Sequence, residues 1–227
     1  MCFYFFSTIY YKSYNLKRNI FQNSFYIMSQ KKKLLLIGNG PIPIDISEKV
    51  NEFDYVFRVN RMTNFPTTGT RIDGVFIGAY KDFRTIYKGG EFKDYFKTAK
   101  QVFLTQELKK WFKDWDEYLT QEQWDNVQIM DFSHNMENIG SKFPTTTLCV
   151  LNVLTSFPEW YENYEIWVCG ITVEGRSELM YNGQPWIKTL HRFDGEKEEI
   201  FLKKLLNENK IKRLIPEIDD CIYNCEG

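Results

Sequence analysis

The sequence lacks most of the features that would assign it to a familiar class. The net charge of its 227 residues is only −1, so no strong global field attracts nucleic acid or an anionic membrane. No CxxC pair occurs among its five cysteines, and it has only two histidines. These absences leave no ligand spacing that is typical of a metal site.

The first 27 residues lack acidic side chains altogether. They carry three basic and ten aromatic residues, but the apolar run is too short for a membrane span and no small-residue cleavage site follows it. An interfacial anchor is one interpretation. We favour another, because Met28 begins MSQKKKLLLIGNG, which is typical of a cytoplasmic start. Residues 1–27 are therefore expected to be a disordered or mis-called extension, and residues 28–227 the folded domain.

Two cysteines lie inside apolar runs. Cys149 and Cys169 are predicted to be buried free thiols rather than a disulfide, since free cysteine behaves as a small apolar residue. This cysteine usage suits a reducing cytoplasm.

Short apolar runs alternate with segments of helical length after Met28. The strand-length runs lie at 34–37, 55–59, 74–77, 101–104, 127–130, 165–169 and 211–214. Helices are predicted at 44–50, 91–100, 105–120, 145–157 and 195–209. The last of these should face inward with Ile200, Phe201, Leu202, Leu205 and Leu206. This order predicts a single α/β, Rossmann-like domain with a mostly parallel sheet flanked by helices.

Glycine-rich or polar turns follow four of the predicted strands. They read GNGP at 38–41, VNRM at 59–62, IGAY at 77–80 and CGIT at 169–172. Ligands of open parallel sheets bind beyond the carboxyl ends of the strands. We therefore expect the ligand site at these turns.

The first turn begins like a dinucleotide fingerprint but departs from it twice. Pro43 stands at the third glycine position, and the second strand lacks the terminal Asp or Glu that would hold a ribose diol. No Gly-Lys-Ser/Thr follows, which excludes a Walker loop. Asn39 can both donate and accept, which suits a phosphate oxygen or a base edge. The alternative is that Asn39 only takes a left-handed turn conformation.

The second strand and the turn after it are rich in polar residues. Strand alternation predicts that Arg58 and Asn60 share a face, which would put a polar cluster beside the glycine turn. Arg71 and Asp73 lead into the third strand, and we expect them to pair with each other rather than with a ligand.

The two histidines differ in their surroundings. His134 lies in a polar stretch and is predicted to be on the surface. His191 precedes the last long helix, and Glu196 follows it at an H-x4-E spacing. A carboxylate so placed could orient the imidazole as a general base. The alternative is a capping histidine with an exposed glutamate, which the spacing alone modestly favours.

Taken together, these stretches resemble the sialyltransferases, both the animal-type family and the bacterial Cst-like family. The large motif is matched by Gly38–Pro41, DYVFRVNR at 54–61 and GTRID at 69–73. The small motif is matched by PTTTLCVLNVL at 144–154 and IWVCGIT at 166–172, and the very-small motif by His191 and Glu196. The resemblance covers about 34–208 in patches. Thr147 stands where glycine is usual, and Tyr181 is the one candidate for the aromatic motif.

The resemblance implies a GT-A-like fold and an inverting, metal-independent transfer from CMP-sialic acid. It implies that His191 is the general base, that Glu196 orients it, and that Tyr181 stabilises the departing phosphate. The donor-binding residues that it implies are Gly38, Asn39, Gly40, Pro41, Asn60, Arg61, Thr145, Thr146, Gly170 and Ile171. No metal or other cofactor is expected.

The resemblance also bears on partners and location. It implies a glycan or glycolipid acceptor, as in lipooligosaccharide or capsule synthesis, and a cytoplasmic protein, with peripheral contact at the inner face of the membrane as an alternative. No nucleic acid partner is expected. The acceptor, the linkage and the oligomeric state are left open. The rival functions are a related transferase for another nucleotide-activated sugar and a non-catalytic nucleotide-binding module.

One short motif points to a different chemistry. Asp114-Trp115-Asp116 has the Asp-x-Asp spelling of many metal-dependent glycosyltransferases. Within the predicted helix at 105–120, positions i and i+2 do not share a face. A solvated helix surface is therefore favoured over a metal site.

Overall fold

The computed structural model describes residues 30–60, 62, 64–78, 93–132, 135–141, 144–173 and 195–216. The chain divides into two compact units, Met1–Lys31 and Lys32–Gly227. Every helix and strand given below belongs to the second unit. The predicted extension at 1–27 lies outside the described residues.

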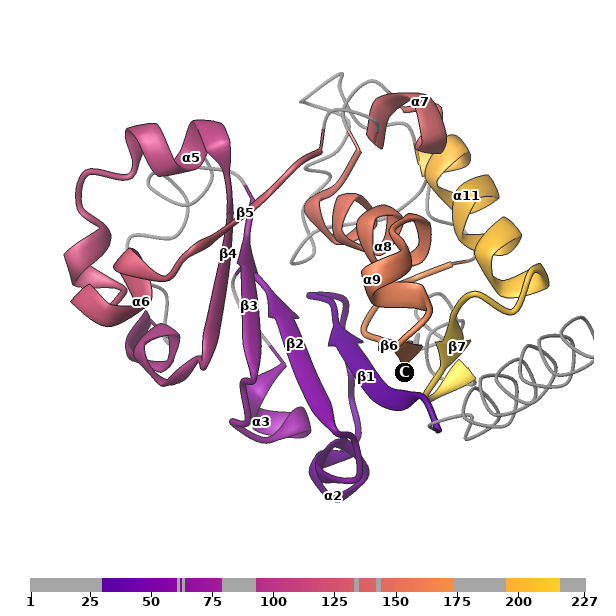
Figure 1. The fold of residues 1–227 in the computed structure, drawn as a ribbon. Helices are drawn as coiled ribbons and strands as arrows, with labels where there is room; N and C mark the ends of the chain where they lie inside the picture. The colour runs from indigo at the N-terminus through magenta and orange to yellow at the C-terminus, as the bar shows by residue number, and fades with distance from the viewer. Residues whose placement is uncertain are drawn as a thin grey trace, which may run out of the picture. The chain divides into compact units, whose positions relative to one another are not determined.

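Within the described residues, seven parallel strands form one sheet, in the order β5-β4-β3-β2-β1-β6-β7 (Figure 1). The strands are β1 (Lys32–Ile37), β2 (Tyr55–Val59), β3 (Gly74–Ile77), β4 (Gln101–Thr105), β5 (Gln128–Met130), β6 (Tyr164–Cys169) and β7 (Lys212–Arg213). The predicted Rossmann-like α/β fold is thereby confirmed. After β1, the chain adds β2, β3, β4 and β5 in turn on one side of the sheet. It then returns to add β6 and β7 on the other side of β1, so the topological switch point lies between β1 and β6.

Helices flank this sheet between the strands. They are α2 (Ser47–Asn51), α3 (Phe65–Thr68), α5 (Gln106–Trp111), α6 (Gln121–Asp125), α7 (Asn135–Ile139), α8 (Thr146–Ser156), α9 (Pro158–Tyr161) and α11 (Gly195–Asn207), with 3-10 turns η1 (Lys93–Thr98) and η2 (Trp115–Glu117). No described helix has the length and apolar character that crossing a membrane requires.

One face of the sheet packs against α8, α9 and α11. Leu34, Leu36 and Phe57 on the strands belong to the same buried cluster as Leu151 on α8 and Leu202 on α11. These helices lie together beside the sheet (Figure 1). Every residue of α8 from 148 to 155 is buried, as expected for a helix whose sequence is apolar nearly all round.

The other face divides into two smaller clusters. Strands β3 and β4 contribute Val75 and Leu104 to a cluster that includes Leu108 of α5. Strands β1 and β2 contribute Leu35 and Val56 to a cluster that includes α2. Alternate strand residues therefore reach opposite layers, as expected for a sheet covered on both faces.

The prediction of one helix over 105–120 was wrong, because α5 ends at Trp111. Thr105 caps α5 by accepting from the amide of Leu108, but the chain leaves the helix at Phe112. The Phe112 ring packs against Tyr118 and Trp124, and this aromatic cluster overrides the local helix propensity. A new capping box between Thr120 and Gln123 then starts α6.

Two further helix predictions need correction. In the predicted helix at 91–100, the described part is the 3-10 turn η1. On α11, Ile200 was predicted to face inward but is 61% exposed. The buried residues of α11 are Gly195, Glu198, Phe201, Leu202 and Leu205. These positions form a stripe with the helical period of three and four residues, and Ile200 lies off that stripe.

Candidate functional site

The turns after β1 and β6 pack backbone against backbone at the switch point. The amide of Gly38 donates to the carbonyl of Cys169 at 2.9 Å, and the amide of Gly40 donates to that of Gly170 at 2.8 Å. A Cβ at Gly38 would overlap the Gly170 carbonyl, and one at Gly40 would lie 2.7 Å from it. The bare backbone of the first turn therefore has a structural cause, which is the close approach of the second turn.

Asn64 links these two turns to the segment after β2. Its Nδ2 donates to the carbonyls of Gly38 and Gly40, both at 2.8 Å, and the residue is only 6% exposed. The same nitrogen would lie 3.0 Å from a Cβ at Gly170. Asn64 was not predicted from the sequence, because its place before Phe65-Pro66 indicates at most a helix N-cap. No local pattern signals a side chain that bridges two distant carbonyls.

Two other asparagines join the ends of neighbouring strands. Asn39 donates from Nδ2 to the Val59 carbonyl at 3.0 Å. Asn60 accepts at Oδ1 from the amide of Gly78 at 3.0 Å. Asn60 has a φ of 48°, whereas Asn39 is not among the described residues with positive φ. The left-handed conformation proposed as the alternative role of Asn39 is therefore adopted by Asn60 instead.

The start of α8 reaches the same edge of the sheet. A Cβ at Gly78 would lie 2.6 Å from Oγ1 of Thr146, so the glycine at the end of β3 lets α8 approach closely. Thr145, Thr146 and Thr147 are all partly exposed. Within the described residues, no acceptor is recorded for the amides of Thr146 and Thr147, as is usual for the first turn of a helix. These amides and hydroxyls form a polar surface beside Asn60.

A carboxylate from α11 also reaches this place. Glu198 is fully buried, and its two oxygens accept from the amide of Thr145 at 2.6 Å and from its hydroxyl at 3.1 Å. Glu196, which was predicted to serve the site, is exposed. In the sequence, the signal for Glu198 is its position on the inward-facing stripe of α11. The prediction placed Ile200 on that stripe and not Glu198.

The buried thiol below Thr145 is not a nucleophile. Burial, followed by the negative charge of Glu198, raises the pKa of Cys149 to about 12. The thiol is therefore neutral at physiological pH, and only the thiolate is reactive. Cys149 and Cys169 are both free and buried, which confirms the prediction made for them.

The structure brings together most of the described residues that were predicted to bind a donor. Gly38, Asn39, Gly40, Asn60, Thr145, Thr146 and Gly170 are joined by the contacts above, with Pro41 and Ile171 next to them in the chain. Ile171 is buried and Pro41 is exposed. Arg61, His134, Tyr181 and His191 lie outside the described residues.

Arg58 was predicted to join Asn60 in a polar cluster, and this was wrong. Arg58 is fully buried and donates to Oγ1 of Thr68 at 2.8 Å and to the carbonyls of Gly69 and Arg71 at 2.7 and 2.9 Å. Burial lowers the pKa of Arg58 to about 10, which leaves it charged at neutral pH. The positive φ of Asn60 ends the strand alternation, so the two side chains do not share a face.

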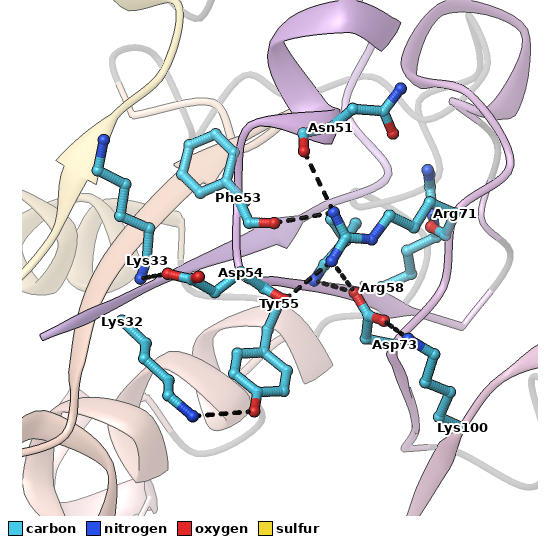
Figure 2. A network of polar contacts seen from close by, with 11 residues as sticks. Lys32, Lys33, Asn51, Phe53, Asp54, Tyr55, Arg58, Arg71, Asp73 and Lys100 are labelled. Atoms are coloured by element: carbon cyan, nitrogen blue, oxygen red, sulfur yellow. Dashed lines mark hydrogen bonds and ion pairs between the residues drawn. The ribbon is translucent and has the colours of Figure 1, made fainter.

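A network of charged side chains lies at the opposite, amino-terminal edge of the sheet (Figure 2). Arg71 forms an ion pair with Asp73 at 2.8 Å, and Lys100 forms another with Asp73 at 2.6 Å. Arg71 also donates to the carbonyls of Phe53 and Asp54, both at 2.8 Å. The predicted pairing of Arg71 with Asp73 is thereby confirmed.

Asp73 is the centre of this amino-edge network. Burial alone would raise its pKa. The hydrogen bonds from Lys100 and from the amide of Val56, with the charges of Arg71 and Lys100, outweigh burial and hold the pKa of Asp73 below its usual value. The charged groups of Arg71, Asp73 and Lys100 therefore pair with one another and with backbone groups.

The Asp-x-Asp motif is not on the long helix that was predicted for it. Asp114 precedes η2 and Asp116 lies in it. Within the described ranges, no three His, Cys, Asp or Glu side chains are grouped so that they could hold a metal ion.

Comparisons with known proteins give a likeness in structure but none in sequence. No protein-family model matches the sequence, and no curated protein matches it significantly. Among solved structures, the chain is similar to the sialyltransferase CstII from Campylobacter jejuni, solved in complex with the substrate analogue CMP-3FNeuAc. The identity is 16%, the TM-score is 0.43, and 82% of each chain is covered.

Proposed function

We propose that this chain is a glycosyltransferase that moves sialic acid from CMP-sialic acid to a sugar hydroxyl. One observation carries the proposal. The turns after β1 and β6, the asparagines at the end of β2 and the start of α8 gather at the carboxyl edge of the sheet, at its switch point. This is where open α/β sheets bind nucleotides, and three of the sialyltransferase-like stretches, GNGP, PTTTLCVLNVL and IWVCGIT, lie on these same elements.

The donor would be held mainly by uncharged groups. The half-buried Asn60 has its Oδ1 engaged by Gly78, and no acceptor is recorded for its Nδ2 among the described residues. Its Nδ2 would donate to the phosphate or ribose of CMP. The amides of Thr146 and Thr147 at the start of an 11-residue helix would face the phosphate, because a helix N-terminus favours an anion. The edge of Gly40 and Pro41 would border the nucleotide.

The chemical step is an inverting displacement. The acceptor oxygen attacks the anomeric carbon of sialic acid from the face opposite CMP, and the bond from that carbon to the phosphate oxygen breaks. His191 takes the proton of the acceptor hydroxyl, since a neutral imidazole can act as a base near neutral pH. Tyr181 donates its hydroxyl to the departing phosphate, and Arg61 adds positive charge near it. These three roles rest on the resemblance of the sequence.

The test is an assay of the full chain with CMP-sialic acid and a panel of lactose-type and glycolipid acceptors. We expect release of CMP that depends on the acceptor and persists in the presence of a chelator, because amide and hydroxyl dipoles would offset the phosphate charge without a metal. His191→Ala should lose about 100-fold or more in kcat. His134→Ala is the matched control and should retain full activity.

The outcomes separate the rival functions. CMP binding without any CMP release would indicate a non-catalytic nucleotide-binding module. Turnover of a different nucleotide-activated acid sugar would indicate the related transferase. A chain that neither binds CMP nor releases it would refute the proposal, and full turnover by His191→Ala would remove the base assignment.

A further inference from the structure

The buried carboxylate of Glu198 binds Thr145, the N-cap residue of α8. Its two bonds engage both the backbone amide and the side-chain hydroxyl of Thr145, so they fix the backbone and the rotamer of one residue together. Hydrogen bonds to an ionised carboxylate are stronger than neutral ones. Because Glu198 is fully buried, water does not compete for these bonds.

The next residue of α8 is the one in contact with the end of β3. Thr146 lies against Gly78, whose amide is held by Asn60. A small movement of Thr145 would therefore shift the first turn of α8 relative to Asn60. The charge of Glu198 also acts on Cys149, one turn further along α8, because it contributes to raising the pKa of the Cys149 thiol. The carboxylate thus lies beneath the site and not at its surface.

We propose that Glu198 is the positioning residue of this site, in place of the exposed Glu196. The inference rests on the proposed function. Glu198 holds the first turn of α8 at the spacing from Asn60 that the CMP phosphate needs. Gly195, the first residue of α11, is four residues after His191 in the chain. Glu198 therefore also connects α11, which follows the proposed general base, to α8, which is proposed to contact the donor.

The test compares Glu198→Gln with Glu196→Gln, a matched change two residues away on the same helix. CMP affinity is measured by calorimetry and turnover by CMP release, both at a temperature well below the unfolding midpoint. We expect Glu198→Gln to raise the Kd for CMP and the KM for CMP-sialic acid by about tenfold, with a much smaller effect on kcat. Glu196→Gln should change the Kd for CMP by less than about twofold.

A second pair of variants guards against a folding defect in Glu198→Gln. Thr145→Ser keeps both donors to Glu198 and should unfold at nearly the same temperature as the wild type. Thr145→Val loses the hydroxyl bond and should weaken CMP binding. In the double variant with Glu198→Gln, the two effects should be less than additive, because both changes remove the same contact.

A readout independent of function is the proton chemical shift of the Thr145 amide. A short bond to a carboxylate should move this signal far downfield in the wild type and in Glu196→Gln, but not in Glu198→Gln. The inference is overturned if the signal does not respond to Glu198→Gln, or if Glu198→Gln binds CMP as well as Glu196→Gln does. If the signal responds but the wild type does not bind CMP, the proposed function fails while the contact that positions α8 stands.

Discussion

The two edges of the sheet are built from different chemistry. At the amino edge, Asp54, Asp73 and Lys100 each stand directly before a strand, and their charges are paired with each other, with Arg71 or with backbone groups (Figure 2). At the carboxyl edge, the described contacts are made by glycine backbones, asparagine amides and threonine hydroxyls, with the one carboxylate of Glu198 buried behind them.

This difference separates residues that hold the fold from residues that are available to a ligand. The charged residues of the conspicuous stretches RVNR and GTRID, as far as they are described, hold the amino edge and the loop after α3. A buried charge is stable only when it is fully paired or hydrogen-bonded. Its donors and acceptors are therefore already used within the protein and do not bind a substrate. Partly exposed amides and hydroxyls retain unused donors and acceptors, and these lie at the carboxyl edge.

The largest expected effect is on stability, at Arg58. Arg58→Met should lower the free energy of unfolding by about 3–5 kcal/mol, because it removes a buried charge that donates to the carbonyls of Thr68, Gly69 and Arg71. Urea unfolding followed by circular dichroism measures this. Arg58→Lys keeps the charge and should recover part of the loss. A stability equal to that of the wild type would refute the structural role of this residue.

Asn64→Asp should destabilise the carboxyl edge itself. The change is nearly isosteric, but it replaces an amide that donates to two carbonyls with carboxylate oxygens that face them. The expected loss is about 2–4 kcal/mol, with weaker CMP binding in the remaining folded protein. Thermal unfolding and calorimetry check the two effects. Unchanged stability would mean that Asn64 does not hold the two turns together.

Asp73→Asn should cost about 2 kcal/mol at pH 7, because Arg71 and Lys100 lose their partner. Since the pKa of Asp73 is lowered in the folded state, the carboxylate stabilises the protein above its unfolded pKa of about 4. That stabilisation is lost as the pH falls through the folded pKa. The difference between wild type and Asp73→Asn should therefore shrink below about pH 4, in urea unfolding repeated across this range. A difference that does not depend on pH would contradict the pairing.

The smallest effect on stability is expected at Asn60, where the change should act on CMP binding instead. Asn60→Asp keeps the acceptor for Gly78 and tolerates the positive φ, so unfolding should change by less than about 0.5 kcal/mol. It removes the amide donor and adds a negative charge at the place proposed for the CMP phosphate. CMP affinity should fall by about tenfold or more. Equal CMP affinity in both proteins would exclude Asn60 from the site.

Local sequence pattern predicted the elements well and the contacts between elements poorly. The bounds predicted for β2 and β3 match those observed, and the other strands differ by one or two residues, because buried parallel strands are short apolar runs. The turn after β1 and the start of α8 were also found, since strand order fixes which edge they occupy. Asn64 and Glu198 were missed because their partners lie 24 or more residues away along the chain, where no local spacing reports them.

The helix errors have the same origin. Phe112 and Ile200 fit helical patterns locally, but the aromatic cluster around Phe112 and the buried Glu198 decided the outcome. Tertiary packing overrides propensity where a large ring or a charge must be buried. The left-handed conformation that was considered as the alternative for Asn39 is adopted by Asn60 instead.

The most direct measurement is a titration of isotope-labelled protein with CMP, followed by the amide signals of each residue. If cytidylate binds at the carboxyl edge, saturable shifts will appear at Gly40, Asn60, Gly78 and Thr146, while Asp73 and Lys100 at the amino edge stay unchanged. No saturable shift at any concentration, or shifts confined to the amino edge, would contradict the assignment of the nucleotide site.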